Sequence, residues 1–315
     1  MSAMCVSTEV FSYEVAQVAA SERSNEGNDA DTVVIATALA TDELGNYQMS
    51  VLSRVLEVTA EYGGLSISRH PQPMSQSRQV RSLLEGSADV MWSVTSKSRE
   101  RKLIPIRLPL LRGYSGHRVI VVNAAKKSEF KQITSLEDLK VKQFVQGSDW
   151  PDLEILQSNG FRVLSEDWST WFRSMYLLVE RNVVDGFPRN IIEIHNDIRH
   201  FDNNALSVEE NHLLSYPNYE YFFVRPDKPQ LANRIRLGLI RLIQSGELEE
   251  IFFSIDSHKL ANKLLHDPKR QVHKLKNPLL RAPLDYADWV ENPELAIKAV
   301  EKELGYPSLA IDIND

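Results

Sequence analysis

Short apolar runs alternate with segments of helical periodicity from residue 32 onward. Three runs have the length and composition of buried strands, at residues 33–38, 65–67 and 88–92. Between them, apolar residues of 49–59 recur at helical spacing, and a second helical face at 80–84 stops at Gly86. This strand–helix–strand–helix–strand order predicts a parallel sheet with right-handed crossovers.

The same order begins again in the middle of the chain. Ser135, with an acid three residues later, predicts a capped helix, and residues 221–224 predict a strand that returns to the first sheet. A long amphipathic helix is expected over 231–246. The further predicted strands are residues 118–123, 141–145, 163–164 and 183–187. We therefore expect two lobes joined by two crossing strands, with a hinge near Val121 and Phe223.

The expected fold class is α/β, each lobe being a mainly parallel sheet flanked by helices. Residues 31–121 and 224–280 form a discontinuous first lobe, and residues 122–223 form the second. Residues 1–30 are rich in Ser, Glu, Asn and Ala and are expected to be disordered. Residues 281–315 are expected to be a helical tail packed on the first lobe.

Charge and composition narrow the function classes. The 315 residues include 36 basic and 43 acidic side chains, a formal net charge of −7 without a basic cluster, which argues against a nucleic-acid partner. No apolar run approaches the ~20 residues of a membrane helix. The single cysteine, Cys5, excludes an internal disulfide framework and a Cys-based zinc site. Glu9 and Glu14 interrupt any apolar leader, so either the protein is cytoplasmic or a signal sequence precedes Met1.

Sequence signatures of catalysis are missing. The chain has no G-x-S-x-G, no G-x-x-x-x-G-K-[ST], and no G-x-G-x-x-G after its first strand. His195 and His200 are five residues apart on a predicted helix, which places them on different faces and argues against a metal site there. We expect no cofactor and no metal.

A more informative segment lies between Asp89 and Arg101, in which a buried strand runs into a hydroxyl-rich loop. In open α/β sheets ligands bind beyond the carboxyl ends of strands. Hydroxyl groups with a guanidinium at that end suit a carboxylate, which an arginine pairs with bidentately. The candidate ligand-binding residues of this loop are Trp92, Ser93, Ser96 and Arg101.

The second predicted sheet has a matching turn at Gly147-Ser148-Asp149, whose free N–H groups favour an anion. Trp92 and Trp150 lie beside the two loops, where either ring could stack on a ligand. Trp168 and Trp171 are at helical spacing and are expected to pack in the core. The candidate residues of the second lobe are Ser148, Asp149 and Arg189.

The order of the elements, together with LLEGSADVMWSVTSKSRER, resembles the type 2 periplasmic solute-binding proteins, in particular the polar amino-acid-binding group (family 3-like) of ABC transporters. ITSLEDLK with VKQFVQGSDW, and VRPDKPQLANRIRLGLIRLIQSGELEEIF, extend the resemblance from about residue 31 to about 253. It implies that Ser93, Ser96 and Arg101 hydrogen-bond the carboxylate of a ligand, and that Ser148 contacts it from the second lobe.

Two departures from this family change the expected solute. The aromatic-Pro-Pro-Phe loop that follows its first strand is replaced by Thr41, Asp42 and Glu43. The acid that binds the ammonium of the ligand falls on Asn190, next to Arg189 in a DGFPR stretch found in a divergent subset. An arginine there would repel an ammonium and attract a second negative group. The expected solute is therefore anionic, either amino-acid-like or a dicarboxylate.

The resulting hypothesis is an extracytoplasmic, periplasmic solute-binding protein. It would be a monomer and not an enzyme, closing over its solute for uptake through an ABC transporter permease. Three alternatives stay open: a sensing module that acts through a membrane sensor partner, an interaction module without a ligand, and a dehydratase-like enzyme on the same fold. For the enzyme, Glu193 would be the general acid, and a raised pKa at Glu193 would support it.

Overall fold

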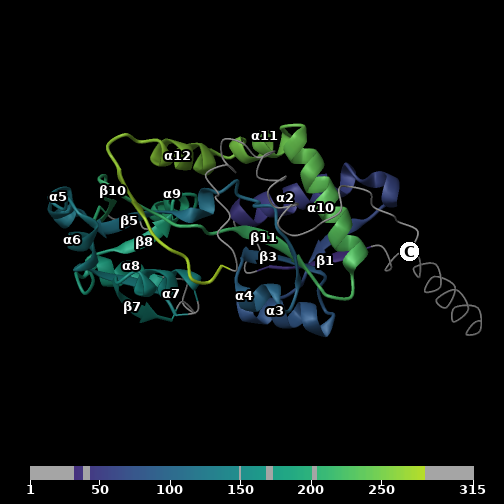
Figure 1. The fold of residues 1–315 in the computed structure, drawn as a ribbon, viewed down its shortest axis with the longest axis horizontal. Helices are drawn as coiled ribbons and strands as arrows, with labels where there is room; N and C mark the ends of the chain where they lie inside the picture. The colour runs from purple at the N-terminus through teal and green to yellow at the C-terminus, as the bar shows by residue number, and fades with distance from the viewer. Residues whose placement is uncertain (1–31, 38–42, 149, 168–172, 201–203, 281–315) are drawn as a thin grey trace, which may run out of the picture.

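The computed structural model describes residues 32–37, 43–148, 150–167, 173–200 and 204–280. Two lobes lie side by side along the long axis of the molecule, each built on a sheet with helices against it (Figure 1). The expectations for residues 1–30 and for the tail at 281–315 lie outside the described residues. Within the described part of the chain, no helix has the length and apolarity needed to cross a bilayer.

The first lobe contains a five-stranded sheet. Its strand order is β2 (Ser66–Arg69), β1 (Thr32–Ala36), β3 (Val90–Val94), β11 (Glu220–Val224) and β4 (Ile104–Ile106). The strands predicted at 33–38, 65–67 and 88–92 are confirmed within two residues at each end, and they pair in parallel as expected. β11 runs antiparallel to both of its neighbours, which marks it as the strand that returns from the second lobe.

Helices cover the first sheet, and α2 (Glu43–Glu57), α3 (Gln76–Glu85) and α10 (Pro229–Gln244) lie where the apolar periodicity predicts them. The shorter helices α4 (Lys97–Glu100) and α11 (Glu247–Phe253) complete the set. α3 ends at Gly86, whose φ of 83° is the left-handed conformation that glycine adopts readily. α2 and α10 pack closely, because a Cβ on Gly238 would come within 2.7 Å of the Val55 carbonyl oxygen.

The second lobe repeats this arrangement in a less regular form. One sheet has the order β12 (Gln271–Lys274), β10 (His212–Ser215), β5 (His117–Asn123), β8 (Phe187–Asn190), and β9 (Leu206–Val208) also pairs with β5. β6 (Gln143–Gly147) and β7 (Arg162–Glu166) form a parallel pair that reaches this sheet through a bridge between Phe144 and Gly186. The order β7-β6-β8-β5-β10 thus mirrors β2-β1-β3-β11-β4.

Short helices surround the second lobe. They are α5 (Lys127–Lys131), α6 (Leu136–Lys140), α7 (Pro151–Ser158), α8 (Arg173–Glu180) and α9 (Ile194–His200), with a 3-10 turn at Ala124–Lys126. α12 (Asp256–Leu265) lies between α11 and α9, and its His258 stacks on Phe252. Two other 3-10 turns lie at Ala60–Tyr62, after α2, and at Tyr114–Gly116, before β5. The predicted cap of α6 is confirmed: the Ser135 hydroxyl accepts a hydrogen bond from the Asp138 N–H at 3.1 Å.

The crossing between the lobes differs from the expected hinge. Residues 108–116 lead from β4 to β5, and residues 216–219 lead back from β10 to β11; we call these two segments the crossing. The two segments touch, since the Ser115 hydroxyl donates to the Asn218 carbonyl at 2.5 Å and the Tyr216 N–H donates to the Gly116 carbonyl at 3.0 Å. Val121 and Phe223, predicted as the hinge, are instead fully buried inside β5 and β11, where ladder hydrogen bonds prevent rotation.

The strand pairing also shifts the lobe boundaries. β5 hydrogen-bonds only with strands of the second sheet among the described residues, so the first crossing lies before His117 rather than at residue 121. β12 pairs with β10 and therefore belongs to the second lobe, although residues 224–280 were all expected in the first. The sequence of β12, QVHK, has no apolar run that could have predicted a strand there.

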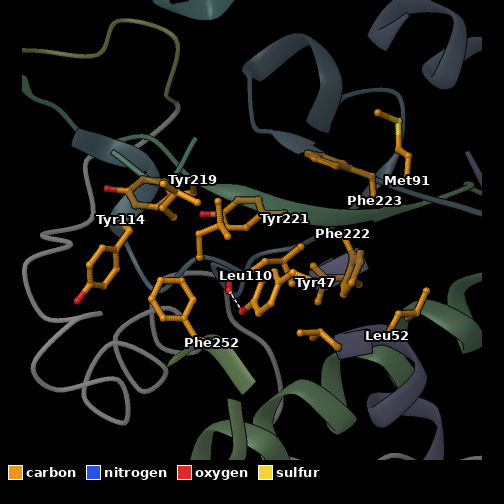
Figure 2. Close-up of a cluster of buried hydrophobic side chains, with 14 of the residues drawn as sticks. Tyr47, Leu52, Met91, Leu110, Tyr114, Tyr219, Tyr221, Phe222, Phe223 and Phe252 are labelled. Carbon is orange, nitrogen blue, oxygen red and sulfur yellow. Dashed lines mark hydrogen bonds between the residues drawn. The ribbon is translucent and has the colours of Figure 1, made fainter. Parts of the chain in front are cut away.

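The main hydrophobic core extends from the first lobe through the crossing into the second lobe, where Val119, Met175 and Phe187 belong to it. Figure 2 shows its aromatic part, to which Tyr114, Tyr219, Tyr221, Phe222 and Phe252 contribute buried rings. The Tyr47 hydroxyl donates to the Leu110 carbonyl at 2.6 Å, so a side chain of α2 also holds the crossing segment. A smaller core belongs to the second lobe alone and comprises Ile120, Val122, Phe130, Leu139, Phe144, Ile155, Leu156, Phe161, Leu214, Tyr216 and Leu275.

A buried histidine pair joins β12 to β10. His212 Nδ1 lies 3.0 Å from His273 Nε2, and His212 Nε2 lies 3.0 Å from the Phe130 carbonyl oxygen. Because a carbonyl only accepts, His212 carries its proton on Nε2, and His273 donates to His212 Nδ1. Arg270 and the buried Glu209 complete the cluster, with Arg270 donating to the His212 carbonyl at 2.9 Å. Burial and His212 lower the pKa of His273 to about 4.

The close approach at Gly116 predicts a stability loss on substitution. A Cβ at this position would lie 2.5 Å from the Tyr216 carbonyl oxygen, so Gly116→Ala must push the two crossing segments apart. We expect a decrease of about 1–3 kcal/mol in the free energy of unfolding, measured by urea titration. Gly64→Ala is the control, because a Cβ there meets nothing within 4 Å. Equal stabilities of the two variants would contradict this packing.

The lowered pKa of His273 predicts acid sensitivity of the β10–β12 junction. Between pH 6.5 and about 4 the unfolded chain binds a proton that His273 in the folded chain does not, so stability present above pH 6.5 is lost as the pH falls. His273→Gln keeps a side-chain N–H donor and cannot titrate. Urea unfolding across this pH range should show a smaller loss for His273→Gln than for the wild type. Parallel pH profiles would refute the expectation.

Candidate functional site

The strand register brings the carboxyl ends of β3 and β8 to the crossing from opposite lobes. β11 starts at the crossing and pairs antiparallel with β3, placing Glu220 opposite Val94. β5 also starts at the crossing and pairs antiparallel with β8, placing Arg118 opposite Asn190. In open α/β sheets this end of the strands is where ligands bind. The candidate site is therefore formed by the residues that follow β3 and β8.

Polar side chains gather at the end of β3. Ser93 is only 4% exposed, and its hydroxyl donates to Gln76 Oε1 at 3.3 Å. The guanidinium of Arg99 donates to the same Gln76 oxygen at 2.9 Å and to the Val94 carbonyl. Arg99 therefore folds back over the end of the strand from the one-turn helix α4.

Thr95, the first residue after β3, hydrogen-bonds to an ion pair between Glu100 and Arg107. Its hydroxyl donates to Glu100 Oε1 at 2.7 Å, and Glu100 Oε2 accepts from Arg107 Nη2 at 2.8 Å. The Thr95 N–H donates to the Tyr219 carbonyl at 2.8 Å. These bonds fix the loop after β3 both to the crossing and to Arg107, which directly follows β4 and is paired with Glu100.

Ser96 and Arg101 do not converge as the sequence suggested. The Ser96 hydroxyl caps α4 by accepting from the Arg99 N–H at 3.3 Å. Arg101 ends α4 as an exposed side chain, whereas Arg99 is half-buried. Successive helical residues turn by about 100°, so positions 99 and 101 point to nearly opposite sides. The structure therefore directs Arg99, rather than Arg101, toward the end of β3.

Two further buried polar residues lie at this end of the first sheet. Gln48 Nε2 donates to Glu220 Oε1, and both side chains are buried. Burial and the Glu220 carboxylate raise the pKa of the neighbouring Tyr47 hydroxyl. Trp92 alternates with Ser93 along β3 and therefore lies on the other face of the sheet, half-buried against the main core.

In the second lobe, the turn after β6 is occupied by a tryptophan. Trp150 precedes α7, and its ring covers Gly147, where a Cβ would come within 2.7 Å of the indole. The ring stacks on Phe187 at 6.3 Å between centroids. Ser148 is exposed, and its N–H donates to the Glu166 carbonyl at 2.8 Å. The candidates Asp149, Thr41, Asp42, Trp168 and Trp171 lie outside the described residues.

Arg189 lies within β8 and is almost fully buried, with 7% of its side chain exposed. Its Nη2 is 2.6 Å from both Glu193 Oε2 and Asp197 Oδ2, and its Nε donates to the same Asp197 oxygen at 2.7 Å. The guanidinium carbon lies 5.2 Å from the centroid of Trp150 and 5.3 Å from that of Phe187. Burial alone would lower the pKa of Arg189, but the carboxylates of Asp197 and Glu193 raise it.

A second buried ion pair adjoins this one. Arg118 Nε lies 2.6 Å from Asp152 Oδ1, and its Nη1 donates to the Ser115 carbonyl of the crossing at 2.6 Å. The Tyr216 hydroxyl also donates to Asp152. Burial alone would raise the pKa of Asp152, but Arg118 lowers it, so Asp152 stays ionised in the folded protein. This pair holds β5, α7 and the crossing together.

Glu193 is the acid of this region with most access to water, its side chain being 30% exposed. Burial raises its pKa, Arg189 opposes that effect, and the nearby Asp197 adds to it. The two arginines Arg118 and Arg189 thus share three carboxylates, those of Asp152, Glu193 and Asp197. Among the described residues, no group of three or more His, Cys, Asp or Glu side chains could hold a metal ion.

The three-dimensional arrangement matches solved binding proteins over both lobes. An ancestral arginine-binding protein bound to arginine superposes with a TM-score of 0.52 at 18% identity, over 72% of this chain and 99% of that one. A probable amino-acid ABC transporter extracellular-binding protein from Bacillus subtilis gives a TM-score of 0.53 at 17% identity, over 72% and 97%. The chain has the type 2 periplasmic-binding-protein fold.

Other structures of this fold include a histidine kinase sensor domain with similarity to periplasmic binding proteins, at a TM-score of 0.53 and 16% identity, over 72% of this chain and 96% of that one. No protein-family model and no curated protein matches the sequence. The residues after β3 and β8, which form the candidate site, lie where the two lobes meet at the crossing.

The sequence did not indicate Arg99, Glu100, Arg107, Asp152, Asp197 and Glu220 as site residues. A signal existed for one of them: Asp197 follows Arg189 by eight residues, and a buried arginine requires an acid nearby. Nothing in the sequence shows that Glu220, the first residue of the return strand, is buried.

The Arg189 cluster predicts a large effect of truncation. Arg189→Ala leaves Asp197 and Glu193 without their main cation, and we expect a loss of about 3–5 kcal/mol in the free energy of unfolding. Methylguanidinium at low millimolar concentration should restore part of the thermal stability by occupying the space that the guanidinium leaves beside Trp150 and Phe187. Arg199→Ala, on the exposed side of α9, is the control. A loss no larger than that of the control would refute the ion-pair assignment.

Proposed function

We propose that this protein is an extracytoplasmic solute-binding protein whose lobes close over a small solute at the crossing. The observation that carries the proposal is the convergence of polar groups after β3 and β8 on either side of residues 108–116 and 216–219. Two lobes that can rotate about paired connections are the usual means by which such proteins enclose a ligand. No residue arrangement described above requires catalysis.

The charges favour a solute with one carboxylate. Arg99, Ser93 and Gln76 form a polar group at the end of β3 that suits a carboxylate, because a guanidinium and hydroxyl donors match its oxygens. Arg189 already pairs with two acids, so a second negative group on the solute would gain little there. Glu193, which is partly exposed, suits an ammonium instead. We therefore favour an amino-acid-like solute over a dicarboxylate.

The solved relatives support delivery to a transporter, since one is described as a probable amino-acid ABC transporter extracellular-binding protein and another as an arginine-binding protein. We extend this to a periplasmic or extracellular location, to a permease complex as the partner, and to a monomeric chain. Sensing through a membrane partner is the second candidate function, favoured by the likeness to a histidine kinase sensor domain.

The raised pKa of Glu193 is the one observation that favours the enzyme alternative. However, Glu193 Oε2 lies 2.6 Å from Arg189 Nη2, and a general acid needs its proton free for transfer. Product analysis of every solute that binds, by NMR, would reveal such an activity. A solute that binds without change supports the binding protein.

A thermal-shift screen tests the function and the solute class together. The panel contains amino acids, monocarboxylates, dicarboxylates and sugar acids. A solute present at 100 times its Kd adds about 2.7 kcal/mol of stability, which such a screen detects readily. We expect a hit among the amino acids. A hit confined to dicarboxylates would overturn the single-carboxylate argument, and no hit would favour the sensing or ligand-free interaction module.

Variants of Arg99 and Arg101 distinguish the carboxylate ligand that the structure favours from the one that the family resemblance implies. Loss of a charge-assisted hydrogen bond costs about 1.5–3 kcal/mol, so Arg99→Ala should weaken binding of the solute about tenfold to a hundredfold in isothermal titration calorimetry. Arg101→Ala, which removes an exposed guanidinium two residues away, should leave the Kd unchanged. The reverse result would restore Arg101 as the carboxylate ligand.

A further inference from the structure

After α12 the chain passes to the second lobe and then returns toward the first. We call residues 267–280 the strap. In Figure 1 it is the yellow segment that leaves α12, descends along the second lobe and turns back toward the middle of the molecule. The strap is a connection between the lobes in addition to the two segments of the crossing.

The strap is firmly anchored on the second lobe. Its strand β12 pairs in parallel with β10 over four residues, and Leu275 is buried in the core of the second lobe. Arg270 donates to the carbonyls of Glu209 and His212, both at 2.9 Å, and the buried His212–His273 pair lies between the two strands. Separating β12 from this lobe would expose an apolar side chain and leave buried polar groups unpaired.

The middle of the strap crosses to the connection between the lobes. Asn159, at the end of α7, donates to the Lys276 carbonyl at 2.7 Å and accepts from the Lys276 N–H at 3.0 Å. One residue further, Asn277 Nδ2 donates to the carbonyl of Pro217 in the crossing at 2.7 Å. These contacts guide the strap over the crossing toward the first lobe.

Among the described residues, the far end of the strap takes its hydrogen bonds to the first lobe from one residue, Lys97, while Leu280 packs against the main core. The Lys97 N–H donates to the Leu279 carbonyl at 3.2 Å, and Lys97 Nζ donates to the Pro278 carbonyl at 3.0 Å. Lys97 is the first residue of α4 and directly follows Ser96 of the candidate ligand loop. Its side chain is exposed, so these two hydrogen bonds compete with water.

We propose that the strap is a releasable clasp between the lobes, anchored on the second lobe by β12 and opened at Lys97. Because the anchor is buried and the Lys97 contacts are exposed, lobe separation breaks the contacts at α4 first. The clasp favours the lobe arrangement seen in this structure before any solute is present and links the ligand loop directly to the second lobe. This inference builds on the two-lobed motion of the proposed function but does not depend on the identity of the solute.

Substitutions at Lys97 remove the clasp in two steps. Lys97→Ala removes only the bond to the Pro278 carbonyl. Lys97→Pro removes that bond and the backbone N–H that Leu279 accepts, while proline suits the first position of a helix. Ser96 already has the extended conformation that a following proline requires, with φ −152° and ψ 155°. Lys102→Ala removes an exposed lysine just beyond α4 and is the control.

The readout is the distance between the lobes of the full chain without solute. In a Cys5→Ser background, dyes on Ser245→Cys at the end of α10 and Ser165→Cys on β7 report that distance by single-molecule fluorescence energy transfer. Lys97→Pro should shift the population to longer distances, Lys97→Ala should shift it less, and Lys102→Ala should leave it unchanged. Hydrogen exchange of the β12 amides should remain slow in every variant.

Two outcomes would overturn the clasp. An unchanged distance in Lys97→Pro would show that the strap does not restrain the lobes. Loss of β12 protection together with the longer distance would show that the strap detaches as a whole rather than opening at Lys97. Neither measurement uses a solute, so a failure of the solute screen leaves this test intact, and a failed clasp leaves the solute-binding proposal intact.

Discussion

Contact between the two crossing segments is the constraint on which the rest of the structure depends. The Ser115 hydroxyl bonded to the Asn218 carbonyl, and the Tyr216 N–H bonded to the Gly116 carbonyl, force β5 and β11 to start side by side and to run into opposite lobes. Each of these strands pairs antiparallel with the last parallel strand of its lobe. The carboxyl ends of β3 and β8 must then meet at the crossing, and the candidate site is built from the residues that follow them.

Which charges the candidate site can offer to a solute depends on which of its buried arginines are already paired with acids. An arginine removed from water needs an anion, and Arg189 and Arg118 find theirs in Asp197, Glu193 and Asp152 rather than in a solute. In the sequence Arg189 is a positive charge that could bind a second negative group of a solute, whereas in the structure it is paired with Asp197 and Glu193. The site offers basic groups mainly from the first lobe and a partly exposed acid from the second, a polarity that matches a zwitterion better than a dianion.

The sequence predicts the elements that carry strong apolar patterns and misses those that do not. The strand at 33–38, the helix end at Gly86 and the return strand at 221–224 all appear in the structure, because burial on both faces or a left-handed glycine leaves a local signal. β4, β9 and β12 have three or four residues each and draw their stability from neighbouring strands. Arg99 was missed because its direction depends on where α4 begins, which a one-turn helix does not reveal in its sequence.

The strap is a third connection between the lobes, and it changes the free-energy cost expected for lobe opening in a two-lobed protein. With only two connections, lobe opening costs little beyond the contacts across the site, and solute supplies most of the preference for closure. A strap bonded to α4 would stabilise the lobe arrangement of this structure in the absence of solute, so moving the lobes away from it would also cost the contacts at Lys97. The same strap must also be broken before a solute can leave. Slow release suits a module that holds its ligand and signals better than one that delivers many molecules in succession, which makes the strap relevant to the choice between sensing and transport.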